Sequence, residues 1–567
     1  MDIIPENLAA IAPILSQYLA PLLNWLSQQV YERLLAHAAN HPLVQLARLL
    51  DFRSLERACA GYRHQGGRGR PNVHTVAKLL RALFVKYWFD WSLRRLEEEI
   101  RYNLLVKWFV GYALYEEGPD HTTLHRFEVY LYQEHPRRFF DSVLEQIDAS
   151  VEDGHEQVQI GDTFALRANA ALESLLQRLR HSSYQLLHAW QASDPEGYAA
   201  IYPHLDGEAL FGLKGEQPEY TLASGQWRQR LLLTVTVVES CLGLLPPAAT
   251  NSAAVQRRVE QLSKIMSDEL ELARDEKGRL IGVSLLPKKQ RGRRCICSAT
   301  DPEATIRNHG EHKKDFGANV SLAVTPTFIR EIRADTGCSA DVSAIPAMLA
   351  GQAEHHDVCP EKLIYDQIAG TGKTVHEVAV ASGGQTQLVA KPMPPKQSPT
   401  FGPEAFTLSD DGLWLTCPNG RRSNRRYGAG SGDGAIFRFT PPHCLGCSLV
   451  KPCRGSEKTP TTKRDVFISD YRPEYDRLVA YSQTAAFKAD MKLRPHVERI
   501  IAALVGHNGA RRARFVGLKK MDFQMKMCAM SYNAKRWLVL LAEKEGRHRR
   551  QPRRRWELPV PTGGLSC

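Results

Sequence analysis

The sequence predicts an α/β protein with an all-helical N-terminal part. Apolar residues recur at helical spacing through roughly the first 150 residues, and from about residue 156 they alternate as in strands. Further strand and helix signals then follow in the order β-β-β-α-β. A chain of 567 residues, 43% of them hydrophobic, is long enough for about two to four compact units with real cores.

The helical prediction rests on spacing and on capping residues. Apolar residues from Val76 to Phe84 follow the pattern of an amphipathic helix, with Asn72 as its expected cap, and Asp120 occupies the N-cap position of another helix. Residues 7–31 lack charge but contain two prolines, which predicts a packed helical pair rather than a membrane span. Short helices with basic outer faces favour a helix-turn-helix-like DNA-binding module, with a purely structural bundle as the alternative.

The strand series begins with an expected strand over 157–168. Strands over 316–324 and 328–332, a helix over about 341–353 and a strand ending at Asp366 complete it. This is the element order of an RNase H-like mixed sheet. The predicted parts are a helical N-terminal domain (1–150), an RNase H-like core (151–170, 300–380 and 485–545), a mostly helical insertion (171–299), a cysteine-containing insertion (381–484) and a basic C-terminal tail (546–567).

Within the first insertion, residues 171–190 and 252–274 return to helical spacing. Between them, Leu231 to Glu239 is rich in β-branched residues and is predicted as a strand.

Three acidic residues stand in settings that suit metal-dependent chemistry. Asp162 ends the strand-like run from Val158, Asp366 ends a second such run, and Glu498 lies on a late helix four residues after Arg494. Cleavage of a phosphodiester needs an activated oxygen nucleophile and a stabilised leaving oxygen, which two Mg²⁺ ions held by carboxylates can supply. The expected roles are Asp162 as the ligand shared by both metals, Asp366 on one metal and Glu498 on the other.

Each of these acids also has a structural interpretation. Asp162 and Asp366 could simply end strands, and Glu498 could pair with Arg494 on one helix face. Their joint placement favours catalysis. Competing candidates at a helix start or in loops are Asp341, Asp357 and Glu474.

Charge and cysteine content restrict the partner and the compartment. The formal charge is +12 and the isoelectric point is near 9.1, which favours a polyanionic partner; solvated basic segments are the alternative. No signal peptide is indicated, and 12 cysteines without secretion signals argue against a disulfide framework. A reducing, cytoplasmic setting without a membrane is expected.

The cysteines of the second insertion have metal-site spacing. Cys444 and Cys447 form a C-x-x-C pair, with Cys453 six residues on and Cys417 upstream. Four thiolates can close a tetrahedral Zn²⁺ site that folds a module with a small core. Buried, unligated cysteines are the alternative.

Several segments together resemble DDE-class transposases of insertion sequences. The first-aspartate block from Asp162 to Ala170 is similar to that of the family, and so is the Arg-x-x-x-Glu core formed by Arg494 and Glu498. The similar segments keep the family's order and span about 45 to 540. Further matching segments are Asp120–Leu124, Thr300–Ala304, Gly317–Val324, Arg511–Lys520 and Asn533–Trp537.

The chain departs from the family pattern at two positions of the catalytic helix. Met491 and Val505 stand where the family often has tyrosine and lysine, which weakens the expected contacts to DNA phosphates. A separate segment, Gly370 to Thr374, looks like the end of a phosphate-binding loop, but Gln367 replaces its required first glycine. An ATPase is therefore not expected.

The resemblance implies an enzyme that binds the terminal inverted repeats of its own element. It would cleave the DNA at each end and transfer the 3′ ends to target DNA by two-metal phosphoryl transfer, with two Mg²⁺ (or Mn²⁺) ions and a structural Zn²⁺. Double-stranded DNA, a homodimer in the synaptic complex and a nucleoid-associated cytoplasmic location follow from it. The alternatives are an inactive or domesticated DNA-binding derivative and a structure-specific nuclease with the same core. Expected DNA-binding residues are Arg68, Arg70, Lys288, Lys289, Arg291, Arg494, Arg511, Arg512 and Arg514.

Overall fold

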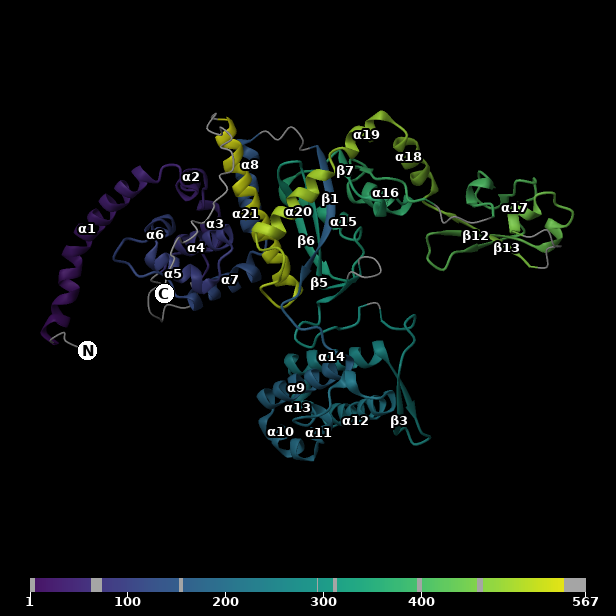
Figure 1. Ribbon diagram of the computed structural model, residues 1–567, viewed down its shortest axis with the longest axis horizontal. Helices are drawn as coiled ribbons and strands as arrows, with labels where there is room; N and C mark the ends of the chain where they lie inside the picture. Colours follow the sequence, from purple (N-terminus) through teal and green to yellow (C-terminus); the bar gives the residue numbers. More distant parts are fainter. Residues whose placement is uncertain are drawn as a thin grey trace, which may run out of the picture. The chain divides into compact units, whose positions relative to one another are not determined.

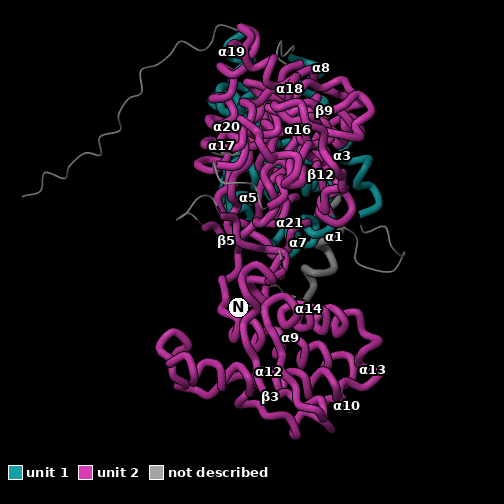
Figure 2. Tube along the Cα trace, turned by 90° about the vertical axis from the view of Figure 1, so that its right-hand side faces the viewer, with its two compact units in different colours: residues 1–130, 142–151, 530–567 teal, residues 131–141, 152–529 magenta. Residues whose placement is uncertain are grey.

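The computed structural model describes residues 6–62, 74–151, 157–292, 294–308, 314–394, 400–455 and 462–544. Arg68, Arg70, the expected cap Asn72 and the basic tail over 546–567 lie outside the described residues. The chain divides into two compact units, one of residues 1–130, 142–151 and 530–567, the other of residues 131–141 and 152–529 (Figure 2).

The N-terminal region is helical, as predicted. Residues 7–31, however, lie within one continuous helix, so the prediction of a helical pair is wrong (Figure 1). A proline removes one backbone hydrogen bond and can bend a helix without ending it when the flanking turns continue. The helices are α1 (Glu6–His37), α2 (Pro42–Leu49), α3 (Arg53–Ala58), α4 (Val76–Phe89), α5 (Leu93–Tyr102), α6 (Leu104–Val110), α7 (His121–Glu134) and α8 (Arg138–Ser150).

Two capping side chains set where helices begin. Helix α4 is capped by Thr75, whose hydroxyl accepts a hydrogen bond from the Lys78 backbone N–H, rather than by a residue further upstream. Asp120 accepts from the Thr123 N–H at 2.6 Å, as predicted for a cap. That bond, with one from the Thr122 hydroxyl, lowers the pKa of Asp120 to about 2.

A six-stranded mixed sheet forms the centre of the second unit (Figure 1). Strand β1 (Val158–Arg167) is central: it pairs antiparallel with β5 (Lys314–Val324) and parallel with β7 (Lys362–Ile364). Strand β6 (Ile329–Thr336) and β4 (Thr305–Asn308) pair antiparallel with β5, and β8 (Gln387–Val389) pairs parallel with β7. The four strands predicted for this sheet and the α/β class are therefore confirmed, although β7 ends at Ile364 rather than at Asp366.

Burial explains why these segments are strands. From Gly317 to Val324 every residue of β5 is buried, as expected for a strand covered on both faces. Helices α15 (Ile345–His356) and α16 (Gly372–Ala381) pack an apolar cluster against β7 and β8 that includes Met348, Tyr365 and Val378. Helix α20 (Pro495–His507) packs against β1.

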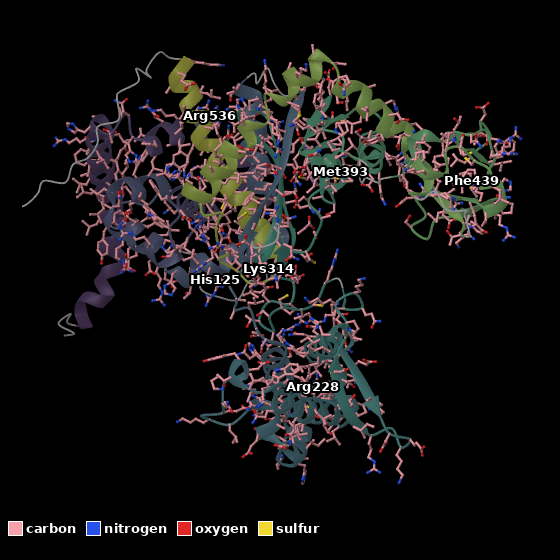
Figure 3. All side chains as sticks on the ribbon, turned by 45° about the vertical axis from the view of Figure 1, so that its right-hand side comes forward. His125, Arg228, Lys314, Met393, Phe439 and Arg536 are labelled. Carbon is pink, nitrogen blue, oxygen red and sulfur yellow. The ribbon has the colours of Figure 1, made fainter. Side chains whose placement is uncertain are left out.

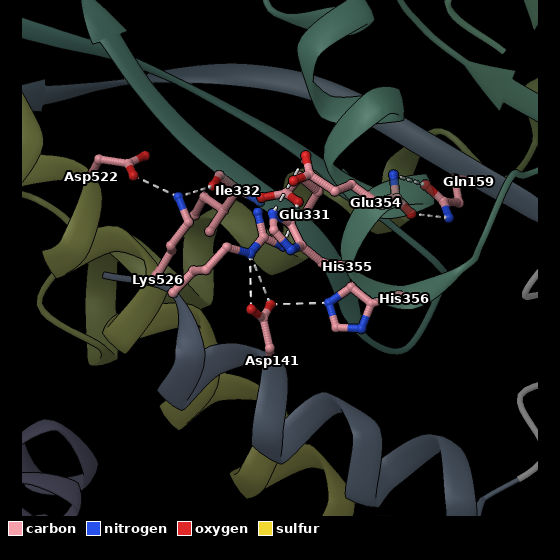
Figure 4. A network of polar contacts seen from close by, with 11 residues as sticks. Asp141, Gln159, Glu331, Ile332, Glu354, His355, His356, Asp522 and Lys526 are labelled. Carbon is pink, nitrogen blue, oxygen red and sulfur yellow. Dashed lines mark hydrogen bonds and ion pairs between the residues drawn. The ribbon is translucent and has the colours of Figure 1, made fainter. Parts of the chain in front are cut away.

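The start of α21 (Leu518–Lys544) is tied to β6 by polar contacts. Asp522 accepts a hydrogen bond from the Ala334 N–H at 2.9 Å. Lys526 donates to the Ile332 carbonyl at 3.2 Å and to Asp522 at 2.6 Å (Figure 4). On the neighbouring α15, the buried His356 ring lies 3.0 Å from the carboxylate of Asp141 (Figure 4). These contacts fix helices on the sheet.

The region over 171–299 is mostly helical, but the predicted strand at Leu231–Glu239 is wrong. That segment lies in a helix, with Leu231, Val235 and Val238 buried at spacings of three and four residues. Burial of one helical face overrides the β propensity of its valines and threonines. The elements are α9 (Leu175–Ser193), α10 (Pro195–Ile201), α11 (Gly207–Phe211), α12 (Ser224–Gly243), α13 (Pro247–Thr250), α14 (Ala253–Glu269), β2 (Leu270–Arg274) and β3 (Leu280–Leu285).

The region with the clustered cysteines is a small β module. Phe406, Leu415, Phe437, Phe439 and Ile468 form its core. Its elements are β9 (Thr407–Leu408), β10 (Leu415–Thr416), β11 (Arg425–Gly428), β12 (Gly434–Phe439), α17 (Val450–Arg454) and β13 (Arg464–Ser469), and α18 (Arg472–Ser482) and α19 (Ala485–Met491) follow it.

Candidate active site

Asp162 lies in the middle of β1 rather than at its end, and Asp366 lies two residues beyond the end of the neighbouring β7, where it caps the turn Gln367–Ala369. Ile160 pairs with Ile364 in the parallel β1–β7 register, so two residues further Asp162 comes opposite Asp366. Burial raises the pKa of Asp162 above its ordinary value, and the charge of Asp366 acts in the same direction. The two carboxylates are thus close enough to repel each other in a half-buried setting.

Arg494 offsets this repulsion. Its Nη2 donates to Oδ2 of Asp162 at 3.2 Å, while the Thr163 N–H donates to Oδ1 at 2.8 Å. Both contacts lower the pKa of Asp162, against the larger effect of burial. Nη1 of Arg494 is buried and has no hydrogen-bond partner among the described residues, so the guanidinium keeps a spare donor beside the acids.

Glu498 is exposed in the first turn of α20. It lies one turn beyond Arg494, about 6 Å along the helix axis. Arg494 makes its ion pair with Asp162, and Glu498, four residues further, follows it on the same side of the helix with an exposed side chain. Over the described ranges, no three or more His, Cys, Asp or Glu side chains are grouped so that they could hold a metal ion. The structure therefore places two of the three predicted acids together and the third on the adjacent helix.

Gly161 and Tyr365 support the site and were not predicted. A Cβ on Gly161 would stand 2.0 Å from Cε2 of Tyr365, so only glycine lets the ring lie across β1. The tyrosine is buried and donates to the Asp341 carbonyl at 3.3 Å. Burial, followed by the nearby carboxylates, raises its pKa and keeps it a neutral donor. A glycine next to an acid in a buried strand is the sequence signal for such a close approach.

Asp341, a competing candidate, belongs to a separate polar network. Its Oδ1 accepts from Arg307 at 3.1 Å and from Asn319 at 2.9 Å, and Arg307 also donates to the Thr163 hydroxyl at 2.7 Å. Burial alone would raise the pKa of Asp341, but these bonds hold it below its ordinary value. Alternation along β1 directs Thr163 away from the face of Asp162. The network therefore holds β1 from the face opposite Asp162.

The two remaining acidic candidates lie in helix-end positions. Asp357 caps α15 at its C-terminal end in the left-handed conformation, with φ of 52°. Glu474 lies in the first turn of α18 and pairs with Arg477 at 3.2 Å. Both have local structural roles.

The segment from Gly370 to Thr374 is a tightly packed helix start. The Thr371 hydroxyl accepts from the Thr374 N–H and caps α16. A Cβ on Gly370 would meet the Lys391 carbonyl at 1.9 Å, and one on Gly372 would meet the Tyr471 carbonyl at 2.1 Å. Close backbone packing accounts for these glycines.

Comparison with known families agrees with this geometry. Residues 31–129 match a family described as Transposase domain (DUF772), and residues 416–538 match one described as Transposase DDE domain. Together the two matches support an insertion-sequence DDE transposase. The second match covers Arg494 and Glu498, but it begins after both aspartates in the chain. No curated protein and no solved structure matches this transposase.

The four predicted zinc ligands of the transposase, all within the DDE match, line one cavity of about 30 Å³. Burial raises the pKa of Cys453, and the neighbouring Cys444 and Cys417 add to it. Arg454 donates to the sulfur of Cys444 at 3.2 Å. The four thiols line the same cavity but do not form a group that could hold a metal ion among the described residues. Zinc binding therefore stays a prediction.

Apart from Arg494, the expected DNA-contacting residues that the structure describes lie in two places. Lys288 and Lys289 are exposed in the turn after β3, where Arg291 donates to the Leu286 carbonyl at 2.9 Å. Arg511 and Arg512 are exposed beside the end of β1: the Ala513 N–H donates to the Arg167 carbonyl, and the Arg167 N–H donates to the Arg511 carbonyl.

The Arg511–Arg514 segment therefore follows the strand that carries Asp162. Asn169 donates to the carbonyl of Arg514 at 3.3 Å and fixes the same segment. None of the described helices of the transposase combines the length and the apolar character that crossing a membrane requires.

One more family-like segment has a structural role in the transposase. Oε2 of Glu303 accepts from the Leu518 N–H at 2.8 Å, at the first residue of α21. Asp301 is fully buried beside it, and burial raises the pKa of its carboxyl group. The segment from Thr300 to Ala304 thus anchors the start of the last helix.

Proposed function

We propose that this transposase binds the terminal inverted repeats of its element, cleaves the DNA at each end and transfers the 3′ ends to target DNA by two-metal phosphoryl transfer. The observation that carries the proposal is the charge interaction between Asp162 of β1 and Asp366, which follows the adjacent β7, together with the hydrogen bond from Arg494 to Asp162. The order β6-β5-β1-β7-β8 also fits the expected RNase H-like core.

The donor chemistry of the acids fits Mg²⁺ or Mn²⁺, because hard cations select carboxylate oxygen. Asp162, Asp366 and Glu498 would hold the ions. The repulsion between the two aspartates is what a bound cation would relieve. When bound, such ions supply an activated water and stabilise the leaving oxygen.

The protein contributes positioning. Arg494 and the Thr163 N–H orient the two oxygens of Asp162, so its lone pairs face a fixed direction. The spare Nη1 donor of Arg494 suits a DNA phosphate oxygen. Tyr365 holds β7 against β1 through Gly161, which keeps Asp366 beside its partner.

The test is a strand-transfer assay with Mg²⁺ on DNA carrying the inverted repeats that flank the gene. We expect Asp162→Ala and Asp162→Asn to abolish cleavage while DNA binding, measured by gel shift, stays largely intact. Both substitutions remove a proposed metal ligand but keep every basic side chain that could contact DNA. Asp410→Asn, an exposed acid in a turn, is the control and keeps full activity.

Each outcome separates one class of protein from another. Strand transfer by the wild type supports the transposase activity, and cleavage alone indicates a nuclease. Binding without either indicates an inactive derivative. Equal activity of Asp162→Ala and wild type would reject the proposed site. A homodimer in the synaptic complex and a nucleoid-associated cytoplasmic location belong to the same proposal.

A further inference from the structure

The β module over 400–469 has an apolar face and an exposed one (Figure 3, where Phe439 marks the module). Phe437 and Phe439 of β12 point into the core, so by alternation Ile436 and Arg438 point outward. The sheet order β11-β12-β13 leaves β11 at an edge, and all of its residues are exposed. The module therefore presents one open strand to its surroundings.

This open strand and the turn before it are basic. Residues 412–432 contain arginine at 421, 422, 425 and 426 and no Asp or Glu. We call these four residues, Arg421, Arg422, Arg425 and Arg426, the basic edge. All four are exposed, and none makes an ion pair with a carboxylate in the described part of the chain. Clustered positive charge on a small module is suited to a polyanion.

Aromatic rings hold guanidinium groups at the same surface. Arg422 lies over the Trp414 ring at 4.7 Å, and Arg438 lies over the Tyr427 ring at 4.7 Å. Asp465 orients Arg438 further through bonds of 2.8 and 2.9 Å. A guanidinium that is already ordered loses less conformational entropy when it binds an anion.

The register places these groups in rows across the sheet. Arg425 stands opposite Arg438, and Tyr427 stands opposite Ile436, which in turn pairs with the exposed Phe467. Arg425 and Arg438 thus stand side by side near the exposed rings of Tyr427 and Phe467, and Asp465 stands on the other side of Arg438. Arginine side chains are common partners of DNA phosphate oxygens.

We propose that the basic edge binds the phosphate backbone of duplex DNA, as a contact surface separate from the acidic site. The proposal rests on the proposed function, since it takes DNA as the substrate. Charged residues on an edge strand also prevent unwanted strand pairing, but that role needs only charge, of either sign. Phosphate binding needs positive charge at these positions.

The experiment measures binding of full-length protein to a fluorescein-labelled duplex of unrelated sequence over a range of salt concentrations, without divalent metal. Removing two phosphate contacts makes the slope of log K against log salt less steep by about two. We expect this change for Arg425→Gln/Arg426→Gln. Arg425→Lys/Arg426→Lys keeps the wild-type slope. Lys277→Gln/Arg279→Gln, which removes the same charge at the β2–β3 hairpin, also keeps it.

A second arm uses the duplex with the flanking inverted repeat. Equal slope changes on both duplexes assign the edge to backbone binding in general, and a change on the repeat alone assigns it to the element end. An unchanged slope for the glutamine variant on both overturns the inference. So does an equal change in the hairpin control.

The two proposals fail in different ways. If wild-type protein cleaves DNA and the glutamine variant has an unchanged slope, the catalytic proposal stands and the proposed role of the basic edge is rejected. Wild-type protein that binds through the edge but never cleaves removes the catalytic proposal alone. Melting curves of the glutamine and lysine variants test for misfolding. Both variants change the same two positions, so equal melting temperatures assign any difference in slope to charge.

Discussion

The ionisation of Asp162 is set by opposing neighbours. Burial and the charge of Asp366 favour its protonated form, while the Thr163 N–H and Arg494 favour the carboxylate. A metal ligand has to be deprotonated, so this balance determines the lowest pH at which the site works. Arg494 is a charged group that acts on it in favour of metal binding.

Replacing Arg494 with glutamine should therefore shift the pH dependence of cleavage. Loss of the guanidinium raises the pKa of Asp162 further, so the acidic limb of the rate-against-pH profile moves to higher pH. The measurement is single-turnover cleavage from acidic to neutral pH. Arg499→Gln, a change at an exposed position of the same helix, should leave the acidic limb at its wild-type pH. A uniform loss of rate at every pH, without a shift, would show that Arg494 acts only on DNA.

Gly161 sets the distance between β1 and the Tyr365 ring. In Gly161→Ala the new Cβ would stand 2.0 Å from Cε2, which the packed interior cannot absorb without moving the ring. We expect a loss of about 1–3 kcal/mol in the free energy of unfolding. Cleavage should fall more than DNA binding, because the ring fixes the strand that carries Asp366.

The control for this change is Gly506→Ala on α20, where nothing lies within 4 Å of an added Cβ. Chemical denaturation should show Gly506→Ala as neutral or slightly stabilising. Adding Tyr365→Leu to Gly161→Ala should restore part of the stability. If Gly161→Ala unfolds at the wild-type denaturant concentration and cleaves normally, the ring does not position the site.

At the scale of whole elements, periodicity predicted the strands because burial and backbone propensity agree there. Strand β5 is rich in apolar and small residues and is buried on both faces, so no competing pattern exists. In α12 propensity and packing disagree, and packing of Leu231, Val235 and Val238 decides. The continuous α1 could not be predicted from the sequence. The two prolines indicate what each costs the helix locally, but not which other contacts offset that cost.

The site was predictable to the extent that it lies on strands. Parallel pairing brings Asp162 and Asp366 to one edge, and the sequence shows both acids after apolar runs. The support from Tyr365 through Gly161 depends on a distance between strands, which no sequence spacing states. The position of Glu498 depends on how α20 is docked, again a tertiary property.

The cysteine module allows a test by metal content. If Cys417, Cys444, Cys447 and Cys453 bind zinc, full-length protein purified under reducing conditions contains about one zinc per chain by atomic absorption. Cys444→Ser lowers that content, because a closed site needs its fourth thiolate. Cys338→Ser, an exposed cysteine outside the module, leaves it unchanged.

Removal of zinc should also loosen the module. A small β module has little apolar core, so the binding free energy of the metal is part of its folding free energy. A strong chelator should then increase proteolysis within 400–469. Metal-free wild-type protein with an unchanged proteolysis pattern would show that the four thiols are ordinary half-buried cysteines.

For the whole molecule, the proposed catalytic acids come from distant parts of the chain. The two ends of the helical region over 171–299 meet at one point: the Glu173 N–H donates to the Cys297 carbonyl at 3.0 Å, and its carboxylate accepts from the Ala299 N–H at 2.7 Å. Its 18-residue buried cluster lies apart from the sheet, so it can be large without disturbing β1.

Strand transfer adds a requirement that one site cannot meet. Two element ends have to be cut and inserted together, while we propose one acidic site in each chain, at Asp162 and Asp366. We therefore expect two chains to assemble on paired ends. Size-exclusion chromatography with light scattering, on inverted-repeat duplexes in Ca²⁺ to slow cleavage, should give a complex with two chains and two duplexes. Mixing wild type with Asp162→Asn should reduce joint insertion of both ends more steeply than cleavage of single ends, because every mixed pair lacks one working site. A linear loss of both products would mean that one chain serves both ends in turn.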